Sequence, residues 1–245
     1  MLFTLDQRMH FNPASGVVAR LLVTRWPQAK YNGHNTTGLE GEKFMSITAA
    51  PPGARSPRLL RRFSVQDYHR LIEDGYFAAD ERYELLEGLI IHKMVRNPAH
   101  DVTLDKSQET LRNVLPSGWR LRSPLAITLE DSEPEPDLAI VQGTVERYAT
   151  RHPQPADIAW LGEVAASSLY EDRNEKGRIY ARARVPVYWI INVEQRLVEV
   201  YTDPTGPTDD PHYRQCRKYG LNEQVPLILN GQEVTQLAVG DLLVA

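Results

Sequence analysis

The chain has 245 residues and a formal net charge of −4, and 42% of its residues are hydrophobic. This length suits one domain with an appendage, and the apolar fraction excludes a wholly disordered chain. The single cysteine, Cys216, excludes an intramolecular disulfide and any zinc site built from two or four cysteines.

The charge divides the chain into two parts. Residues 1–62 carry nine basic and three acidic residues, a net charge of +6, which leaves 19 basic and 29 acidic residues, a net charge of −10, in residues 63–245. Residues 1–62 show no sustained helical or strand period and end in a Pro-rich stretch. We expect them to be a disordered basic N-terminal extension and linker, followed by a folded domain over residues 63–245. The alternatives are a basic tail that helps to hold nucleic acid, and a true start of the protein at Met45.

No secretory signal is recognisable, and no apolar run approaches the roughly 20 residues that a bilayer requires. With the lack of paired cysteines, this predicts a cytoplasmic protein without a membrane partner.

The first elements of the folded domain are predicted by local signals. Ser64 followed by Asp67 is typical of a helix N-cap with an acidic residue at N3, and Gly75 ends this helix. Residues 83–86 and 89–95 are predicted strands, joined by a Glu-Gly turn.

The remaining elements alternate between helices and strands. Asn97-Pro98 predicts an N-cap and first turn of a helix that runs to about Leu115. A third helix is predicted within residues 171–184. Strands are predicted at residues 119–129, 137–141, 158–165, 187–193, 196–201, 213–219 and 225–229, with residues 240–244 closing the chain. This order indicates an α/β fold with a mixed β-sheet flanked by helices and an extra C-terminal β-hairpin region.

The frequent catalytic motifs are absent. The sequence contains no GxGxxG, no GxxxxGK[ST], no HExxH and no GxSxG, and its seven histidines have no zinc-ligand spacing. Dinucleotide-binding, P-loop, zinc-protease and serine-hydrolase functions therefore lose support.

Two carboxylates and a lysine remain. Asp137 opens an apolar strand, Glu163 lies inside another, and Lys176 follows Glu163 by thirteen positions on the predicted helix. A charged residue in a buried strand is costly unless it is paired or binds a metal. Two carboxylates that hold Mg²⁺, with a lysine that orients water or offsets negative charge, suit phosphodiester hydrolysis.

Each residue also has an ordinary structural explanation. Asp137 follows two prolines and could serve in a turn or cap, Glu163 could face solvent from an edge strand, and Lys176 could be a solvated helix residue. The combination carries the hypothesis.

Several separated segments of residues 63–244 occur in a characteristic order. They are Tyr83-Glu84-Leu85-Leu86-Glu87-Gly88, His100, Glu135-Pro136-Asp137-Leu138, Gly162-Glu163-Val164, Glu175-Lys176, and Tyr180-Ala181-Arg182-Ala183-Arg184-Val185-Pro186-Val187-Tyr188-Trp189-Ile190. With these segments the sequence resembles a known family, the Uma-two restriction endonucleases of the PD-(D/E)XK nuclease superfamily.

The resemblance implies a restriction-endonuclease-like core with a metal-dependent nuclease site. Glu84 would be the first acidic residue of the site, Asp137 the central metal ligand, and Glu163 the second ligand carboxylate. The carbonyl of Val164 would be a further metal ligand, and Lys176 would take the lysine role. His100 matches a histidine near the family's site, although it could instead contact Asp101 or solvent at the start of its helix.

The sequence departs from the family pattern at three places. The slot two residues after Glu163 holds Ala165 instead of a lysine, which makes Lys176 the displaced lysine. The family's Ser-Pro-Ser is replaced by residues 166–168, Ala-Ser-Ser, and its glycine before the Tyr-Trp strand is replaced by Arg184.

Two functions follow. The first is a Mg²⁺- or Mn²⁺-dependent endonuclease that hydrolyses DNA, with a homodimer expected where both strands are cut. The alternative is a non-catalytic nucleic-acid-binding or regulatory domain, favoured by the −10 charge because phosphate contacts dominate DNA affinity. A glycosidase with paired carboxylates is a distant third. Local basic patches that could hold DNA are Arg120 and Arg122; Arg173, Lys176, Arg178, Arg182 and Arg184; and Arg214, Arg217 and Lys218.

Overall fold

The computed structural model describes residues 45–46, 59–78, 80–93 and 96–243, so the predicted basic extension lies mostly outside the described residues. Its first elements are the paired two-residue strands β1 (Met45–Ser46) and β2 (Leu59–Leu60). Helix α1 (Val65–Glu73) begins as predicted at a capping box. The hydroxyl of Ser64 accepts a hydrogen bond from the Asp67 amide at 3.0 Å, and the Asp67 carboxylate accepts one from the Ser64 amide at 3.1 Å.

The predicted hairpin forms from β3 (Tyr83–Leu86) and β4 (Leu89–His92), which pair in antiparallel register. Both turn residues have positive φ, 48° at Glu87 and 75° at Gly88, which the right-handed twist of a two-residue hairpin favours. A Cβ at Gly88 would lie 2.6 Å from the Cβ of Arg62, so this turn requires glycine.

Helix α2 (Pro98–Val114) also begins where the sequence predicts. The side chain of Asn97 caps it by accepting a hydrogen bond from the His100 amide at 2.9 Å, and Pro98 stands in the first turn. Leu104 and Leu111, seven residues apart and therefore on one face, are buried. This face turns the start of the helix, with His100, toward the interior.

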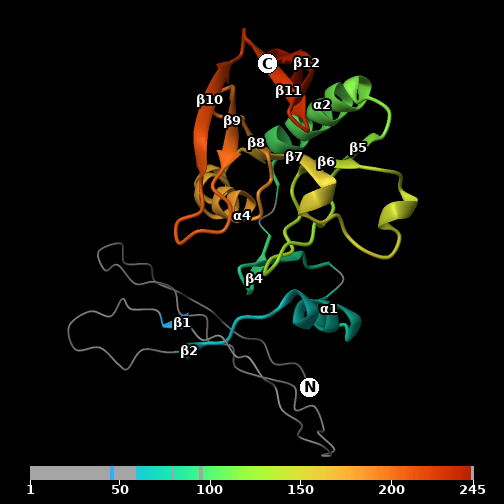
Figure 1. Ribbon diagram of the computed structural model, residues 1–245, viewed down its shortest axis with the longest axis vertical. Coiled ribbons are helices and arrows are strands. Elements are labelled where there is room, and N and C mark those ends of the chain that lie inside the picture. The colour runs from blue at the N-terminus through green and yellow to red at the C-terminus, as the bar shows by residue number, and fades with distance from the viewer. Residues whose placement is uncertain (1–44, 47–58, 79, 94–95, 244–245) are drawn as a thin grey trace, which may run out of the picture. The chain divides into compact units, whose positions relative to one another are not determined.

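A six-stranded mixed sheet forms the centre of the domain (Figure 1). Its strands, in the order β10-β9-β8-β7-β6-β5, are β5 (Trp119–Arg122), β6 (Leu138–Gln142), β7 (Ile158–Ala165), β8 (Val187–Asn192), β9 (Leu197–Pro204) and β10 (Tyr213–Gly220). Only β7 and β8 run parallel, and the other neighbours are antiparallel. Every residue of β7 and β8 is buried, as their continuous apolar runs predict.

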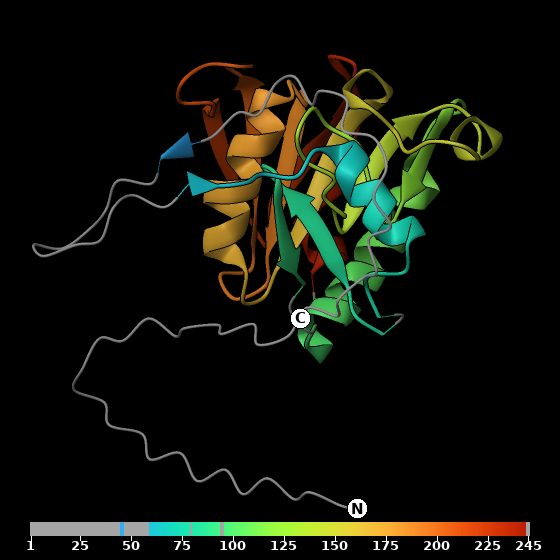
Figure 2. The ribbon, with the colours of Figure 1, turned by 90° about the horizontal axis from the view of Figure 1, so that it is seen from below.

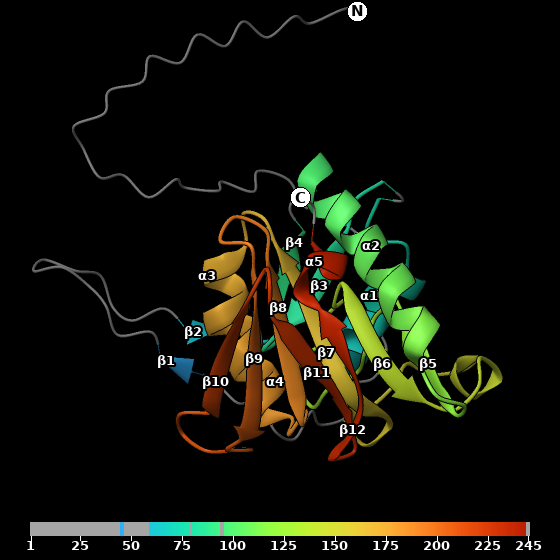
Figure 3. The ribbon, with the colours of Figure 1, turned by 90° about the horizontal axis from the view of Figure 1, so that it is seen from above.

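The two faces of the sheet support two cores, because side chains alternate along each strand. Trp160 and Trp189 lie on the face covered by α2 and by the C-terminal hairpin, whereas Leu161 and Tyr188 face Tyr180 of the crossover helix. Figures 2 and 3 show these faces in turn, with β3–β4, α1 and α4 against one and α2 and α5 against the other.

The crossover between β7 and β8 is helical but not a regular α-helix. It consists of α3 (Leu169–Glu171), a π-helical turn labelled η3 (Asp172–Lys176), and α4 (Gly177–Arg182). The helix ends with Arg184 at φ 60°, where the amide of Arg184 bonds the carbonyl of Ala181 and the amide of Val185 bonds that of Tyr180. This is a Schellman motif with arginine where glycine is usual.

The structure corrects the predicted strands in two places. The strand predicted over residues 119–129 ends at Arg122, because Pro124 follows and has no amide hydrogen for the ladder. The C-terminal hairpin consists of β11 (Gln224–Leu229) and β12 (Gln232–Ala238), and the second strand was not predicted. A bulge leaves Val234 without a partner and disturbs the alternation that would have revealed it. The chain then forms α5 (Val239–Leu242).

The short 3₁₀ helices η1 (Glu146–Tyr148) and η2 (Pro155–Asp157) complete the elements. Within the described residues, none of the helices has both the length and the apolar character that spanning a membrane requires.

Candidate functional site

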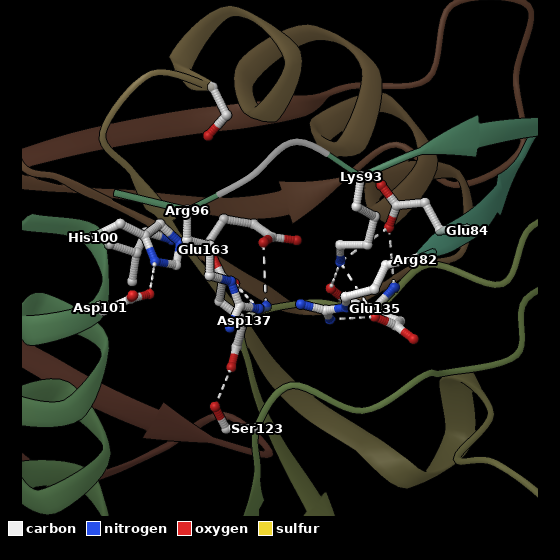
Figure 4. A network of polar contacts seen from close by, with 12 residues as sticks. Arg82, Glu84, Lys93, Arg96, His100, Asp101, Ser123, Glu135, Asp137 and Glu163 are labelled. Atoms are coloured by element: carbon white, nitrogen blue, oxygen red, sulfur yellow. Dashed lines mark hydrogen bonds and ion pairs between the residues drawn. The ribbon is translucent and has the colours of Figure 1, made fainter. Parts of the chain in front are cut away.

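A pocket of about 160 Å³ lies among the β3–β4 hairpin, the start of α2, the start of β6 and the crossover helix. The predicted residues Glu84, His100, Asp137 and Lys176 all line it. Glu163 is 1% exposed and is not among the lining residues, so it lies beneath the pocket surface. Figure 4 shows part of this polar network.

Asp137 stands immediately before β6 and is the centre of the network. Its Oδ2 atom accepts a hydrogen bond from the Val164 amide at 3.0 Å and lies 3.1 Å from Nε2 of His100, while its Oδ1 accepts one from Arg96 at 3.2 Å. Burial alone would raise the pKa of Asp137, but the hydrogen bond with His100 and the charge of Lys176 hold it well below its ordinary value. Asp137 is therefore an ionised carboxylate.

Glu163 lies on the neighbouring strand, β7, on the face toward the crossover helix. Its Oε2 accepts a hydrogen bond from the Asp137 amide at 3.2 Å, and its Oε1 accepts one from the Tyr180 hydroxyl at 2.7 Å. The backbone before β6 thus donates to the Glu163 carboxylate, and the backbone of β7 donates, through the Val164 amide, to the Asp137 carboxylate. These two hydrogen bonds interlock the two acidic residues. Burial raises the pKa of Glu163 from 4.5 to about 8, against the opposing charge of Lys176.

Lys176 comes back over the strand ends, as its position after Glu163 suggested. Its Nζ lies 3.0 Å from Oε1 of Glu163 and 3.6 Å from Oδ1 of Asp172. Burial alone would lower the pKa of Lys176, but the surrounding carboxylates, Glu163 foremost, hold it well above its ordinary value. Lys176 is therefore a cation in this state.

The π-helical turn explains how Asp172 and Lys176 reach the site together. Asp172 begins the turn and Lys176 ends it, and on the side that faces the sheet the Asp172 side chain is buried while that of Lys176 is 13% exposed. The hydroxyl of Tyr188 donates a 3.0 Å hydrogen bond to the backbone carbonyl of Asp172, and the Ser168 hydroxyl donates one of 2.6 Å to its carboxylate. Such turns often occur at functional sites. Burial raises the pKa of Asp172, in part opposed by Lys176.

Glu84 lies farther from the other two predicted acidic ligands. It is 5% exposed on β3, accepts a hydrogen bond from the Glu135 amide at 3.1 Å, and lies 3.6 Å from Nζ of Lys93. In Figure 4 it sits with Lys93 and Glu135, apart from the group around Asp137. The structure thus brings Asp137, Glu163 and Lys176 into contact, and places Glu84 across the same pocket.

His100 has both of the contacts that its position at the helix start allowed. Besides Asp137, its Nδ1 lies 3.4 Å from Oδ1 of Asp101. Burial alone would lower its pKa, but the hydrogen bond with Asp137 gives a net increase. The protonated ring is therefore favoured beside this carboxylate.

The oxygen donors of the site suit a hard divalent cation, but their present arrangement does not surround a metal-binding position. Asp137 and Glu163 offer carboxylate oxygens, and the carbonyl of Val164 points to the same side of β7 as the amide that contacts Asp137. Within the described part of the chain, no three His, Cys, Asp or Glu side chains are arranged to hold a metal ion. The oxygens of Asp137 and Glu163 instead contact Arg96, His100 and Lys176. A metal would have to replace some of these cations.

Three further residues of the site were not predicted from the sequence. Asp172 could have been identified by its position four residues before Lys176, which places the two on one helix face. Tyr180 was noted only as part of the family motif, and no sequence signal marked Arg96. All three contact a predicted carboxylate or lysine.

The mixed sheet, with two carboxylates and a lysine gathered where β6 begins and β7 ends, has the architecture of the restriction-endonuclease-like nucleases. Residues 65–239 match the family model described as "Uma2: Putative restriction endonuclease", and the chain belongs to this family. This confirms the resemblance found in the sequence.

One solved structure supports the fold. It is a crystal structure described as a putative nuclease belonging to DUF820 from Anabaena variabilis, with a TM-score of 0.53 and 15% sequence identity. The similarity covers 74% of this chain and 97% of that chain. The comparison with curated proteins gives no match.

Proposed function

We propose that the protein is a Mg²⁺- or Mn²⁺-dependent endonuclease that hydrolyses DNA phosphodiester bonds. The observation that supports this most directly is the interlocked pair of Asp137 and Glu163, with the ammonium group of Lys176 at 3.0 Å from Glu163. Buried acids are seldom placed side by side unless they are paired or bind a cation. The proposal rests on this geometry and on membership of the nuclease family.

A bound divalent ion would polarise the phosphate and lower the pKa of an attacking water. Asp137 and Glu163 would hold it, with the Val164 carbonyl beside them. The protonated Lys176 has no lone pair to accept a proton, so it would serve as a fixed positive charge near the developing negative charge of the phosphate. Tyr180, which donates to Glu163, would keep that carboxylate pointed at the site. His100 would hold Oδ2 of Asp137 in place, which leaves Oδ1 for the metal.

The expected basic surface patches contribute less than the sequence suggested. Most of their members are held in ion pairs: Arg173 and Lys218 with Glu199, Arg178 and Arg182 with Glu87, Arg182 also with Asp131, and Arg214 with Asp203. Arg122 lies over the ring of Tyr148 and Arg217 over that of Tyr219. Free cations on the surface supply most of the affinity for nucleic acid, so within the second candidate, a non-catalytic nucleic-acid-binding or regulatory domain, these ion pairs favour the regulatory role.

A plasmid-nicking assay with Mg²⁺ or Mn²⁺ distinguishes the two candidates. We expect cleavage by the wild type, and a decrease of at least about 100-fold in Asp137→Asn and Glu163→Gln, since each removes a charge from the metal-binding pair. Asp203→Asn is the matched control, because this carboxylate is half-exposed and pairs with Arg214 outside the site. Cleavage that survives both site substitutions would overturn the proposal. Metal-independent DNA binding without cleavage would support the second candidate.

A further inference from the structure

Arg96 occupies a position that the proposed reaction leaves unexplained. It lies between β4 and α2, one residue before the N-cap of α2, and it lines the pocket. Its side chain is 23% exposed, and its guanidinium lies 3.2 Å from Oδ1 of Asp137. Arg96 therefore covers the Asp137 oxygen that does not contact His100 or Val164.

The other cations of the site are held more firmly. His100 belongs to α2 and contacts two carboxylates, and Lys176 belongs to the crossover helix and lies within 4 Å of two more. Arg96 makes one hydrogen bond within the described residues, so four of its five N–H donors remain available. Of these three cations, Arg96 therefore loses the fewest contacts when it moves away from its carboxylate.

A divalent ion cannot bind Oδ1 of Asp137 while the guanidinium remains against it, because the two positive charges would be only a few ångströms apart. Once displaced, the guanidinium would still lie at the pocket, with a flat set of donors that matches two oxygens of a phosphate.

We propose that Arg96 is an exchangeable counter-ion of Asp137. Without metal it neutralises this carboxylate. When a divalent ion binds, Arg96 leaves Asp137 and binds a phosphate of the substrate. This inference rests on the proposed function and adds a residue that links metal binding to phosphate binding.

The test measures metal binding separately from cleavage. Mn²⁺ alone is titrated by calorimetry into the full-length wild type, Arg96→Gln and Arg96→Lys, without DNA. We expect Arg96→Gln to bind Mn²⁺ about three- to tenfold more tightly, because it removes the competing charge of a partly buried pair. Its kcat/KM for DNA cleavage should nevertheless decrease by about tenfold or more, since a phosphate ligand is lost. Arg96→Lys keeps the charge and should bind Mn²⁺ like the wild type, with partial recovery of cleavage.

Arg147→Gln is the matched control, because this half-exposed arginine also pairs with an aspartate, Asp157, but lies outside the pocket and outside the expected DNA-binding patches. It should change neither quantity. Equal or weaker Mn²⁺ binding by Arg96→Gln would overturn this inference and leave the proposed nuclease function intact. A wild type that binds no Mn²⁺ would overturn both. Tighter Mn²⁺ binding with unchanged cleavage would overturn the phosphate-binding role.

Discussion

The strongest test of the buried charge network is to remove its central cation by the substitution Lys176→Met. Methionine is similar in length but carries no charge, so Glu163 and Asp172 would lose the ammonium group at 3.0 and 3.6 Å. At an effective dielectric constant of about 20, each contact corresponds to roughly 5 kcal/mol of Coulomb energy.

The net loss of stability is smaller than these values suggest. Burying the lysine itself costs several kcal/mol, and the acids can take up a proton when the lysine is gone. Removing one partner of a buried ion pair typically costs about 3–5 kcal/mol, and we expect about 3 kcal/mol here because protonation limits the cost. For a domain of this size, this corresponds to a decrease in Tm of roughly 6–12 °C.

Thermal unfolding without metal measures this decrease at about pH 9, where Glu163 is ionised because the pH lies above its pKa of about 8. Lys218→Met is the matched control, because Lys218 also contacts a buried carboxylate, Glu199, at 3.4 Å, but is 54% exposed and shares that carboxylate with Arg173. It should lose less than about 1 kcal/mol. Mg²⁺ or Mn²⁺ should raise the Tm of Lys176→Met more than that of the wild type, because the ion supplies the missing positive charge. A decrease in Tm no larger than that of the control would refute this account of the network.

Two further predictions concern stability. Arg184→Gly should raise the free energy of unfolding by about 0.5–1 kcal/mol, because it relieves a left-handed conformation that costs roughly 1–2 kcal/mol but gives the unfolded chain more freedom. Denaturant unfolding that finds Arg184→Gly no more stable than Arg184→Ala would contradict this. Separately, the pKa of Glu163 is raised by burial to about 8, so the native state holds this proton more tightly than the unfolded chain. Metal-free stability should therefore decrease between about pH 4.5 and 8, with a slope of at most about 1.4 kcal/mol per pH unit from this group. Glu163→Gln should flatten the slope, and an unchanged slope would exclude Glu163 as its source.

The sequence predicted those structural elements whose formation depends on residues close together in the chain. The Ser64–Asp67 capping box, the Glu87-Gly88 turn and the Asn97-Pro98 helix start each depend on a few adjacent side chains, and all three are confirmed. β12 was missed because its alternation is interrupted by a bulge. A bulge is a property of strand pairing, which a single strand sequence does not reveal.

The site was predictable to the extent that unusual residues marked it. Acidic residues at the start of β6 and inside β7 stand out against apolar neighbours, and the structure brings them together. The π-helical turn could not be read from the sequence, because hydrophobic periodicity over five residues does not distinguish it from an α-helix. The counter-ion Arg96 was also hidden, since its partner Asp137 is 41 residues away.

The ion pairs also change what the domain's charge implies. The sequence counts Arg178 and Arg182 as cations available to DNA, but both bind Glu87 in the turn between β3 and β4, more than 90 residues earlier. These two ion pairs therefore connect the β3–β4 hairpin, which carries Glu84, to α4, the helix that follows Lys176. On the proposed function, these arginines assemble the pocket, and the free positive charge for the substrate comes from the metal and from Arg96. An acidic domain can then act on nucleic acid, because affinity for phosphate is concentrated where the bond is cut instead of being spread over the surface.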